Sequence, residues 1–73
     1  MNENELQDAL KTLLRDIALM NEDEAGDANI PDDLVNLRRV STFEEDGMLT
    51  NNAGLTITTA DGSAFQLILV KSR

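Results

Sequence analysis

Apolar residues in the first third of the chain recur at steps of three and four, which is the spacing of one face of an α-helix. The stripe consists of Leu6, Ala9, Leu10, Leu13, Leu14, Ile17 and Met20. Asn2 is placed to cap the first turn, and Glu5 follows three residues later in the pattern of a capping box. The spacing therefore predicts an amphipathic helix over about residues 3–20, with its apolar stripe facing a core.

The segment after this helix is polar and acidic. Three consecutive acids at residues 22–24 would oppose the negative end of the helix dipole, so the helix should end near Asn21. We therefore expect residues 21–30 to form a loop. Pro31 followed by two aspartates is a favourable opening for a helix, which predicts a short helical turn over about residues 31–37.

Alternation with a period of two begins near Arg38 and predicts β-strands. A three-residue turn at residues 60–62 would place Ile57 opposite Phe65 and gather the apolar side chains on one face. A two-residue turn would split them between both faces. Because register follows the buried face, we predict the first pairing, with Gly62 in the left-handed region of a glycine bulge.

A similar turn at residues 45–47 would pair Phe43 with Leu49 and add a third strand. One face of the sheet would then collect the odd-numbered residues Phe43, Leu49, Ala53, Leu55, Ile57, Phe65, Leu67 and Leu69. Residues 51–54, Asn-Asn-Ala-Gly, interrupt the middle strand and can bulge or break it. If they reverse its parity, the assignment of the first strand fails and the second hairpin stands.

These elements predict a single small α+β domain over residues 1–73. A helix (about 3–20) and a short helical turn (about 31–37) precede a three-stranded antiparallel β-meander, and the helix covers the odd face in two layers. The predicted core is Leu10, Leu13, Ile17, Leu55, Ile57, Phe65 and Leu67.

The even-numbered face of the predicted sheet carries no acid. A solvated face would alternate to charged residues, whereas this one is small, β-branched and apolar. Its alternative interpretations are scattered exposed residues, which are ordinary, or a contact surface. The candidate interface residues are Val40, Thr56, Thr58, Gln66, Ile68 and Val70.

The composition removes most catalytic chemistry. The chain has no Cys, His, Tyr or Trp, which excludes thiolate and imidazole metal ligands and any Ser-His-Asp arrangement. We identify no catalytic, cofactor-binding or metal-binding residue, and we expect a protein that is not an enzyme and uses no cofactor. The longest apolar run, residues 67–70, is too short to span a membrane, and the start lacks the pattern of a signal peptide, so we expect a cytoplasmic protein.

The charge is concentrated in one half of the chain. The net charge is −8, and residues 1–33 carry ten acids against two bases, whereas residues 34–73 carry four of each. Such an acidic surface either only solubilises the protein or attracts a basic partner. It repels the phosphates of nucleic acids, so we expect no direct nucleic-acid binding.

Three hypotheses about function follow. The first is a non-enzymatic, acidic protein-interaction module that forms a homodimer or binds a partner protein through the exposed sheet face. The alternative is an acidic nucleic-acid mimic, of the phage or mobile-element type by analogy, that inhibits a nucleic-acid-binding protein by occupying its basic groove. A small enzyme or metal-binding domain is a third hypothesis, and the missing side chains count against it.

Overall fold

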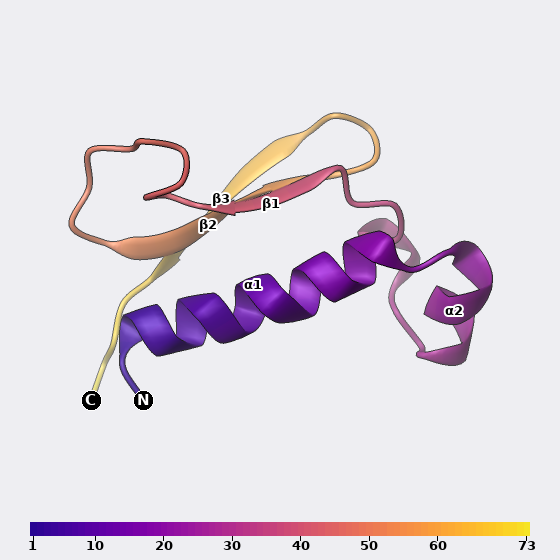
Figure 1. Ribbon diagram of the computed structural model, residues 1–73, viewed down its shortest axis with the longest axis horizontal. Helices are drawn as coiled ribbons and strands as arrows, with labels where there is room; N and C mark the ends of the chain where they lie inside the picture. Colours follow the sequence, from indigo (N-terminus) through magenta and orange to yellow (C-terminus); the bar gives the residue numbers. More distant parts are fainter.

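The computed structural model describes residues 1–73 and has two layers, a helix below and a three-stranded sheet above (Figure 1). The elements, in chain order, are α1 (Glu3–Leu19), α2 (Glu22–Asp27), the 3₁₀ helix η1 (Asp32–Leu34), β1 (Arg39–Thr42), β2 (Ala53–Thr58) and β3 (Ala64–Leu69). The sheet order is β1-β2-β3, and both pairings are antiparallel. The predicted α+β class, with helices first and a meander last, is confirmed.

The start of α1 has the predicted capping box. The Asn2 side chain accepts a hydrogen bond from the Glu5 backbone N–H at 2.8 Å, and the Glu5 carboxylate accepts from the Asn2 N–H at 3.1 Å. Two N–H groups that the helix itself leaves without partners are thereby satisfied. The helix ends at Leu19, one residue before the predicted end.

The prediction of a loop over residues 21–30 is wrong, because α2 forms there. Asn21 caps this helix by accepting a hydrogen bond from the Glu24 N–H at 2.8 Å. The three acids at residues 22–24 occupy its first turn, where the positive end of the helix dipole stabilises them. The same acids that end α1 thus begin a second helix. The helical turn expected over residues 31–37 is confined to η1.

The hairpin of β2 and β3 has the predicted register. Ile57 lies opposite Phe65, and the Thr59 N–H donates to the Ser63 carbonyl at 2.8 Å, which closes the turn. Gly62 has a φ of 89°, in the left-handed region that favours glycine. The predicted register is therefore confirmed, although Phe65 and Leu67 on the face expected to be buried are exposed.

The predicted pairing of Phe43 with Leu49 is wrong. β1 ends at Thr42, residues 43–52 form a long connection, and Val40 lies opposite Ile57. Even-numbered residues of β1 therefore share a face with odd-numbered residues of β2. The odd-even pattern is therefore reversed between β1 and β2. The sequence predicts that the interruption at residues 51–54 can cause such a reversal.

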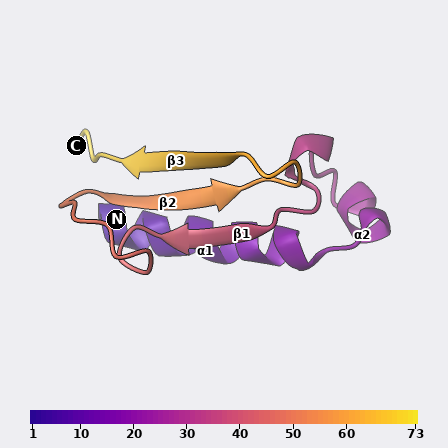
Figure 2. The same cartoon turned by 90° about the horizontal axis from the view of Figure 1, so that it is seen from above.

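The core lies between α1 and the β1-β2 half of the sheet. Its buried members are Ile17, Leu37, Val40 and Leu55, surrounded by Leu10, Leu14, Ala18, Ile30, Leu34 and Ile57. Of the predicted core, Leu13, Phe65 and Leu67 are instead exposed to solvent. The reason is the position of α1, which packs on β1 and β2, while β3 lies to one side (Figure 2).

Polar contacts hold α1 on the β1 side of the sheet. The Gln7 side chain accepts a hydrogen bond from the Gly54 N–H at 2.9 Å, a buried contact. The Arg15 Nε donates to the Val40 carbonyl at 3.1 Å, and the Lys11 Nζ lies 3.0 Å from the Glu45 carboxylate. Each of these contacts joins α1 to β1, to the start of β2 or to the connection between them, and none joins it to β3.

Candidate protein-interaction surface

Strand β3 is exposed on both of its faces. On the face toward the helix layer, Phe65 is 57% exposed and Leu67 39%, and on the opposite face Ile68 is 53% exposed. Only Leu69 among the residues of β3 is half-buried. Large apolar side chains thus lie exposed on both faces of one strand, which makes β3 a candidate contact surface.

The backbone edge of β3 is also open, because β3 is the last strand of the sheet. The residue pair Thr59 and Ser63 is hydrogen-bonded, so the alternation of an antiparallel ladder directs the backbone groups of Phe65, Leu67 and Leu69 toward β2. The backbone groups of the residues between them face away from the sheet. The N–H and C=O groups of Ala64, Gln66 and Ile68 therefore line the free edge, where another strand can pair.

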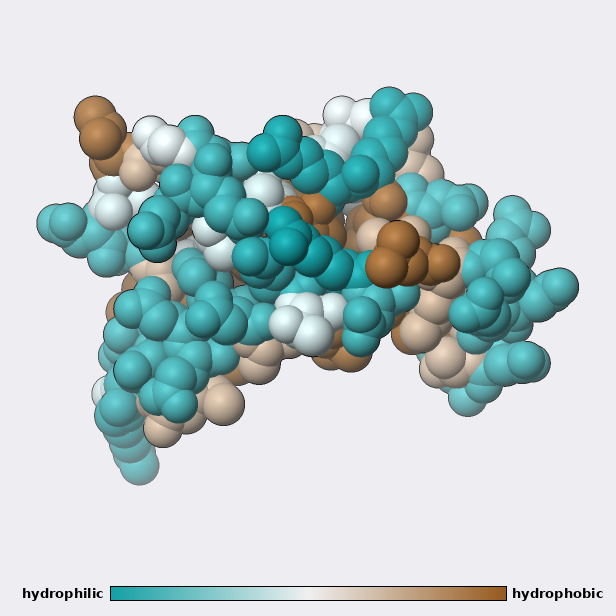
Figure 3. Space-filling view, viewed as in Figure 1, coloured by the Kyte–Doolittle hydropathy of each residue, from teal (hydrophilic) through white to brown (hydrophobic).

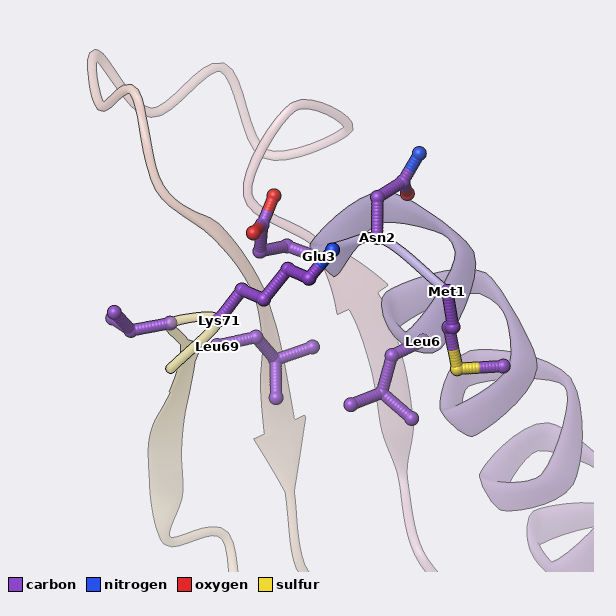
Figure 4. Close-up of a pocket in the computed structure, with 7 residues that line it drawn as sticks. Met1, Asn2, Glu3, Leu6, Leu69 and Lys71 are labelled. Carbon is purple, nitrogen blue, oxygen red and sulfur yellow. The ribbon is translucent and has the colours of Figure 1, made fainter. Parts of the chain in front are cut away.

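A flank of α1 faces the uncovered side of β3. Leu6 lines a hollow of about 160 Å³ together with Met1, Leu69 and Lys71. Figure 4 shows Leu6 and Leu69 projecting into the space between α1 and β3. Leu13 lies two turns further along the same flank and is 55% exposed. The helix thus presents apolar side chains toward β3 without covering it.

The predicted interface residues do not all share one surface. Gln66, Ile68 and Val70 are exposed, and Thr56 and Thr58 are half-buried on the same face. Val40 is placed wrongly by the prediction: it lies on the opposite face, is buried, and belongs to the core. The parity reversal between β1 and β2 moves it there.

The connection after β1 covers part of the outer face, which sequence reasoning missed. Phe43 is buried with its ring against Gly54, where any side chain would collide with the ring and with the Leu67 carbonyl. The Met48 sulfur lies 4.0 Å from the Gln66 amide nitrogen, and the Thr56 hydroxyl oxygen is buried without a hydrogen-bond partner. The glycine inside an apolar strand was the available signal, because such a glycine often marks the close approach of another group.

Glu45 fastens this connection to α1. Its carboxylate accepts a hydrogen bond from the Thr42 N–H at 3.0 Å and lies 3.0 Å from the Lys11 Nζ and 3.3 Å from an Arg15 guanidinium nitrogen. The Thr42 N–H and the Lys11 ammonium lower the pKa of Glu45 from its ordinary value of 4.5 to about 2. These contacts explain a structural role for Glu45, and a functional one is not required.

Asp46 and Asp61 are likewise held by local contacts. Asp46 accepts hydrogen bonds from Arg39 and from the Ser41 hydroxyl, each at 2.9 Å. Asp61 accepts from the Thr59 hydroxyl and the Ser63 N–H, which lower its pKa from 3.8 to about 2. The ion pairs of Glu45 and Asp46 are made by Lys11, Arg15 and Arg39.

Acidic residues gather at the end of the molecule where α2, η1 and the β2-β3 turn lie. Asp32, Asp33 and Asp61 line an open hollow together with Phe65. The α2 end is largely hydrophilic in the space-filling view (Figure 3). The exposed apolar strand β3 thus begins at an acidic end and is followed by Lys71 and Arg73 at the other.

No group of three or more His, Cys, Asp or Glu side chains is arranged to hold a metal ion. None of the helices combines the length and the apolar character that a membrane span requires.

Comparison of the chain with protein families, curated protein sequences and solved structures finds no match.

Proposed function

We propose that this chain is a non-enzymatic, acidic protein-interaction module that binds another polypeptide through β3. The observation that carries the proposal is the state of this strand, which has apolar side chains exposed on both faces and an open backbone edge. A binding polypeptide gains twice from such a strand, because it can pair with the free edge and cover apolar surface in the same contact.

Burial of the exposed apolar side chains of β3 by a bound polypeptide would contribute favourable free energy to binding. Full burial of an exposed large apolar side chain contributes about 1.5–3 kcal/mol, and a partner can supply the part of this that corresponds to the exposed surface of Phe65, Leu67 and Ile68. Only ten of the 73 residues are buried within the chain itself, so a partner would add substantially to a small core.

The experiment replaces the outer apolar residues of this strand and its extension. The double variant Ile68→Lys with Val70→Glu should lose binding to itself and to any partner captured from the source cell, because a charged residue cannot be buried there without a partner. Neither residue belongs to the core, so circular dichroism should show an unchanged fold. Binding is measured by sedimentation and by pull-down with mass spectrometry.

A matched control places the same new residues elsewhere. Leu19 and Leu49 are 85% and 105% exposed and lie outside the sheet, so Leu19→Lys with Leu49→Glu should retain binding. If the β3 double variant keeps its oligomeric state and every captured partner, β3 is not the binding element. Equal losses in both variants would also contradict the proposal, since they would indicate a general effect of charge.

The acidic nucleic-acid mimic is a second candidate function, favoured by the unpaired acids. Of the 14 acidic residues, only Glu45 and Asp46 form ion pairs within the chain. Changing Glu22, Asp23 and Glu24 together to their amides should weaken binding to a basic partner and reduce its salt dependence. The candidate fails if binding is unaffected by these amides and by salt.

A further inference from the structure

We propose that the polypeptide bound by β3 is a second copy of this chain, paired antiparallel through β3 about a twofold axis at Leu67. The inference rests on the proposed function and names its partner. In an antiparallel pair of identical strands the axis stands perpendicular to the sheet, so both copies keep α1 on the same side. The result is a continuous six-stranded sheet with the order β1-β2-β3-β3-β2-β1.

The backbone of the free edge fits this pairing. With the axis at Leu67, Gln66 lies opposite Ile68 of the second copy, and Ala64 lies opposite Val70. The N–H and C=O groups of Ala64, Gln66 and Ile68 already point away from β2. They can therefore form a regular ladder without loss of any hydrogen bond to β2.

The side chains are self-complementary in this register. On the α1 side, Leu67 meets Leu67 of the second copy, and Phe65 meets its Leu69. A register centred on Gln66 would instead place Leu69 opposite Ser63. The Leu67-centred register covers apolar surface with apolar surface and is favoured for that reason.

Charges at the two ends of β3 complement each other across the axis. Residues 62–70 contain no charge, so no like charges meet along the strand, although each chain carries −8. Lys71 and Arg73 follow β3 and Asp61 precedes it, so the antiparallel pairing brings the basic end of one strand toward the acidic end of the other, and neither Arg73 nor Asp61 has an ion-pair partner within its own chain. The antiparallel arrangement also places the two acidic α2 ends at opposite ends of the joined sheet, which keeps their repulsion small.

Single-cysteine variants test the register, because the natural chain has no cysteine. Leu67 would form a non-hydrogen-bonded pair with its copy, with Cα atoms about 4.5 Å apart, inside the range that a disulfide can bridge. Leu67→Cys should therefore convert under mild oxidation from a species of 8.0 kDa to one of twice that mass on a non-reducing gel. Gln66→Cys and Ile68→Cys should cross-link poorly, because each lies diagonal to its copy, about 7–8 Å away.

A proline variant tests the role of the edge. Gln66→Pro removes an N–H at the open edge of the sheet and should give a folded monomer in sedimentation, whereas the wild-type chain should sediment as a dimer. Leu67→Pro is the matched control that should unfold, because its N–H faces β2. Preferential cross-linking of Gln66→Cys would overturn the Leu67 axis.

Failure of this inference is distinguishable from failure of the proposed function. A wild-type chain that is monomeric at the highest concentrations overturns the second copy as partner. If Ile68→Lys with Val70→Glu still abolishes capture of a different protein, binding through β3 stands. If neither a dimer nor a β3-dependent partner is found, both proposals fail.

Discussion

Strands β1 and β3 are the two edges of one sheet, and most residues of β1 are buried whereas most residues of β3 are exposed. Val40, Ser41 and Thr42 of β1 are at most 5% exposed, whereas Phe65 and Ile68 of β3 are more than half exposed. Composition would suggest the reverse, because β1 reads Arg-Val-Ser-Thr and β3 reads Ala-Phe-Gln-Leu-Ile-Leu. Burial in this sheet is decided by what the rest of the chain can reach.

The difference arises from the covering elements. α1 lies on one face of β1 and β2, and the connection at residues 43–52 folds over part of the other face. Glu45 and Asp46 fasten that connection to α1 and to β1. On β3 the same connection contacts Gln66 through Met48 but leaves Phe65 and Ile68 more than half exposed. This exposure is the basis for proposing that β3 makes intermolecular contacts.

The sharpest test of the contrast compares one leucine from each half of the sheet. Leu55 is 0% exposed, so Leu55→Ala should lower the free energy of unfolding by about 2–5 kcal/mol. Leu67→Ala should cost the isolated chain less, about 1 kcal/mol, because the Leu67 side chain is already 39% exposed. Urea denaturation at low protein concentration measures both.

The same two variants can be compared at several protein concentrations. If β3 is covered in a complex, the cost of Leu67→Ala should rise with protein concentration, while that of Leu55→Ala should not. Equal costs for the two variants at every concentration would show that β3 is buried within the chain and would remove the contrast.

A smaller effect is expected where the covering connection meets the sheet. A methyl group at Gly54 would collide with the Phe43 ring and lie 2.5 Å from the Leu67 carbonyl oxygen. Gly54→Ala should therefore lower the free energy of unfolding by about 1–3 kcal/mol. Gly26→Ala in α2, where nothing lies within 4 Å of the added methyl, should be neutral or stabilising by up to about 1 kcal/mol. Equal effects of the two would mean that Phe43 does not pack on the sheet.

Features set by neighbours in the sequence were predictable. The capping box of α1 and the register of the β2-β3 hairpin depend on residues a few positions apart, and both were predicted. The start of α2 was also visible in Asn21 and the acids after it, but these acids were interpreted only as the end of α1. One residue pattern can mark both the end of one helix and the beginning of the next.

Features set by distant contacts were not predictable. The parity of β1 depends on the length of the 43–52 connection, and the position of α1 depends on Gln7 reaching Gly54 and Arg15 reaching Val40. Periodicity assigned Phe65 and Leu67 to the core because it identifies apolar faces and cannot identify what covers them. Exposure of β3 therefore became visible only in three dimensions.

The smallest expected effect is on the stability of the folded chain at acidic pH. It should involve β1, which the 43–52 connection covers, and leave the open edge strand β3 unaffected. The pKa of Glu45 is lowered in the folded chain from 4.5 to about 2, so the stability that its ionised form contributes is complete above pH 4.5. That contribution should be lost as the pH falls from 4.5 toward 2.

Glu45→Gln should flatten this part of the stability curve and loosen the connection over β1, which hydrogen exchange at Thr42 and Phe43 would report. Glu44→Gln is the matched control, because the Glu44 carboxylate makes no ion pair. An unchanged acid slope in Glu45→Gln, or faster exchange in β3 rather than β1, would contradict the role of Glu45 in covering β1.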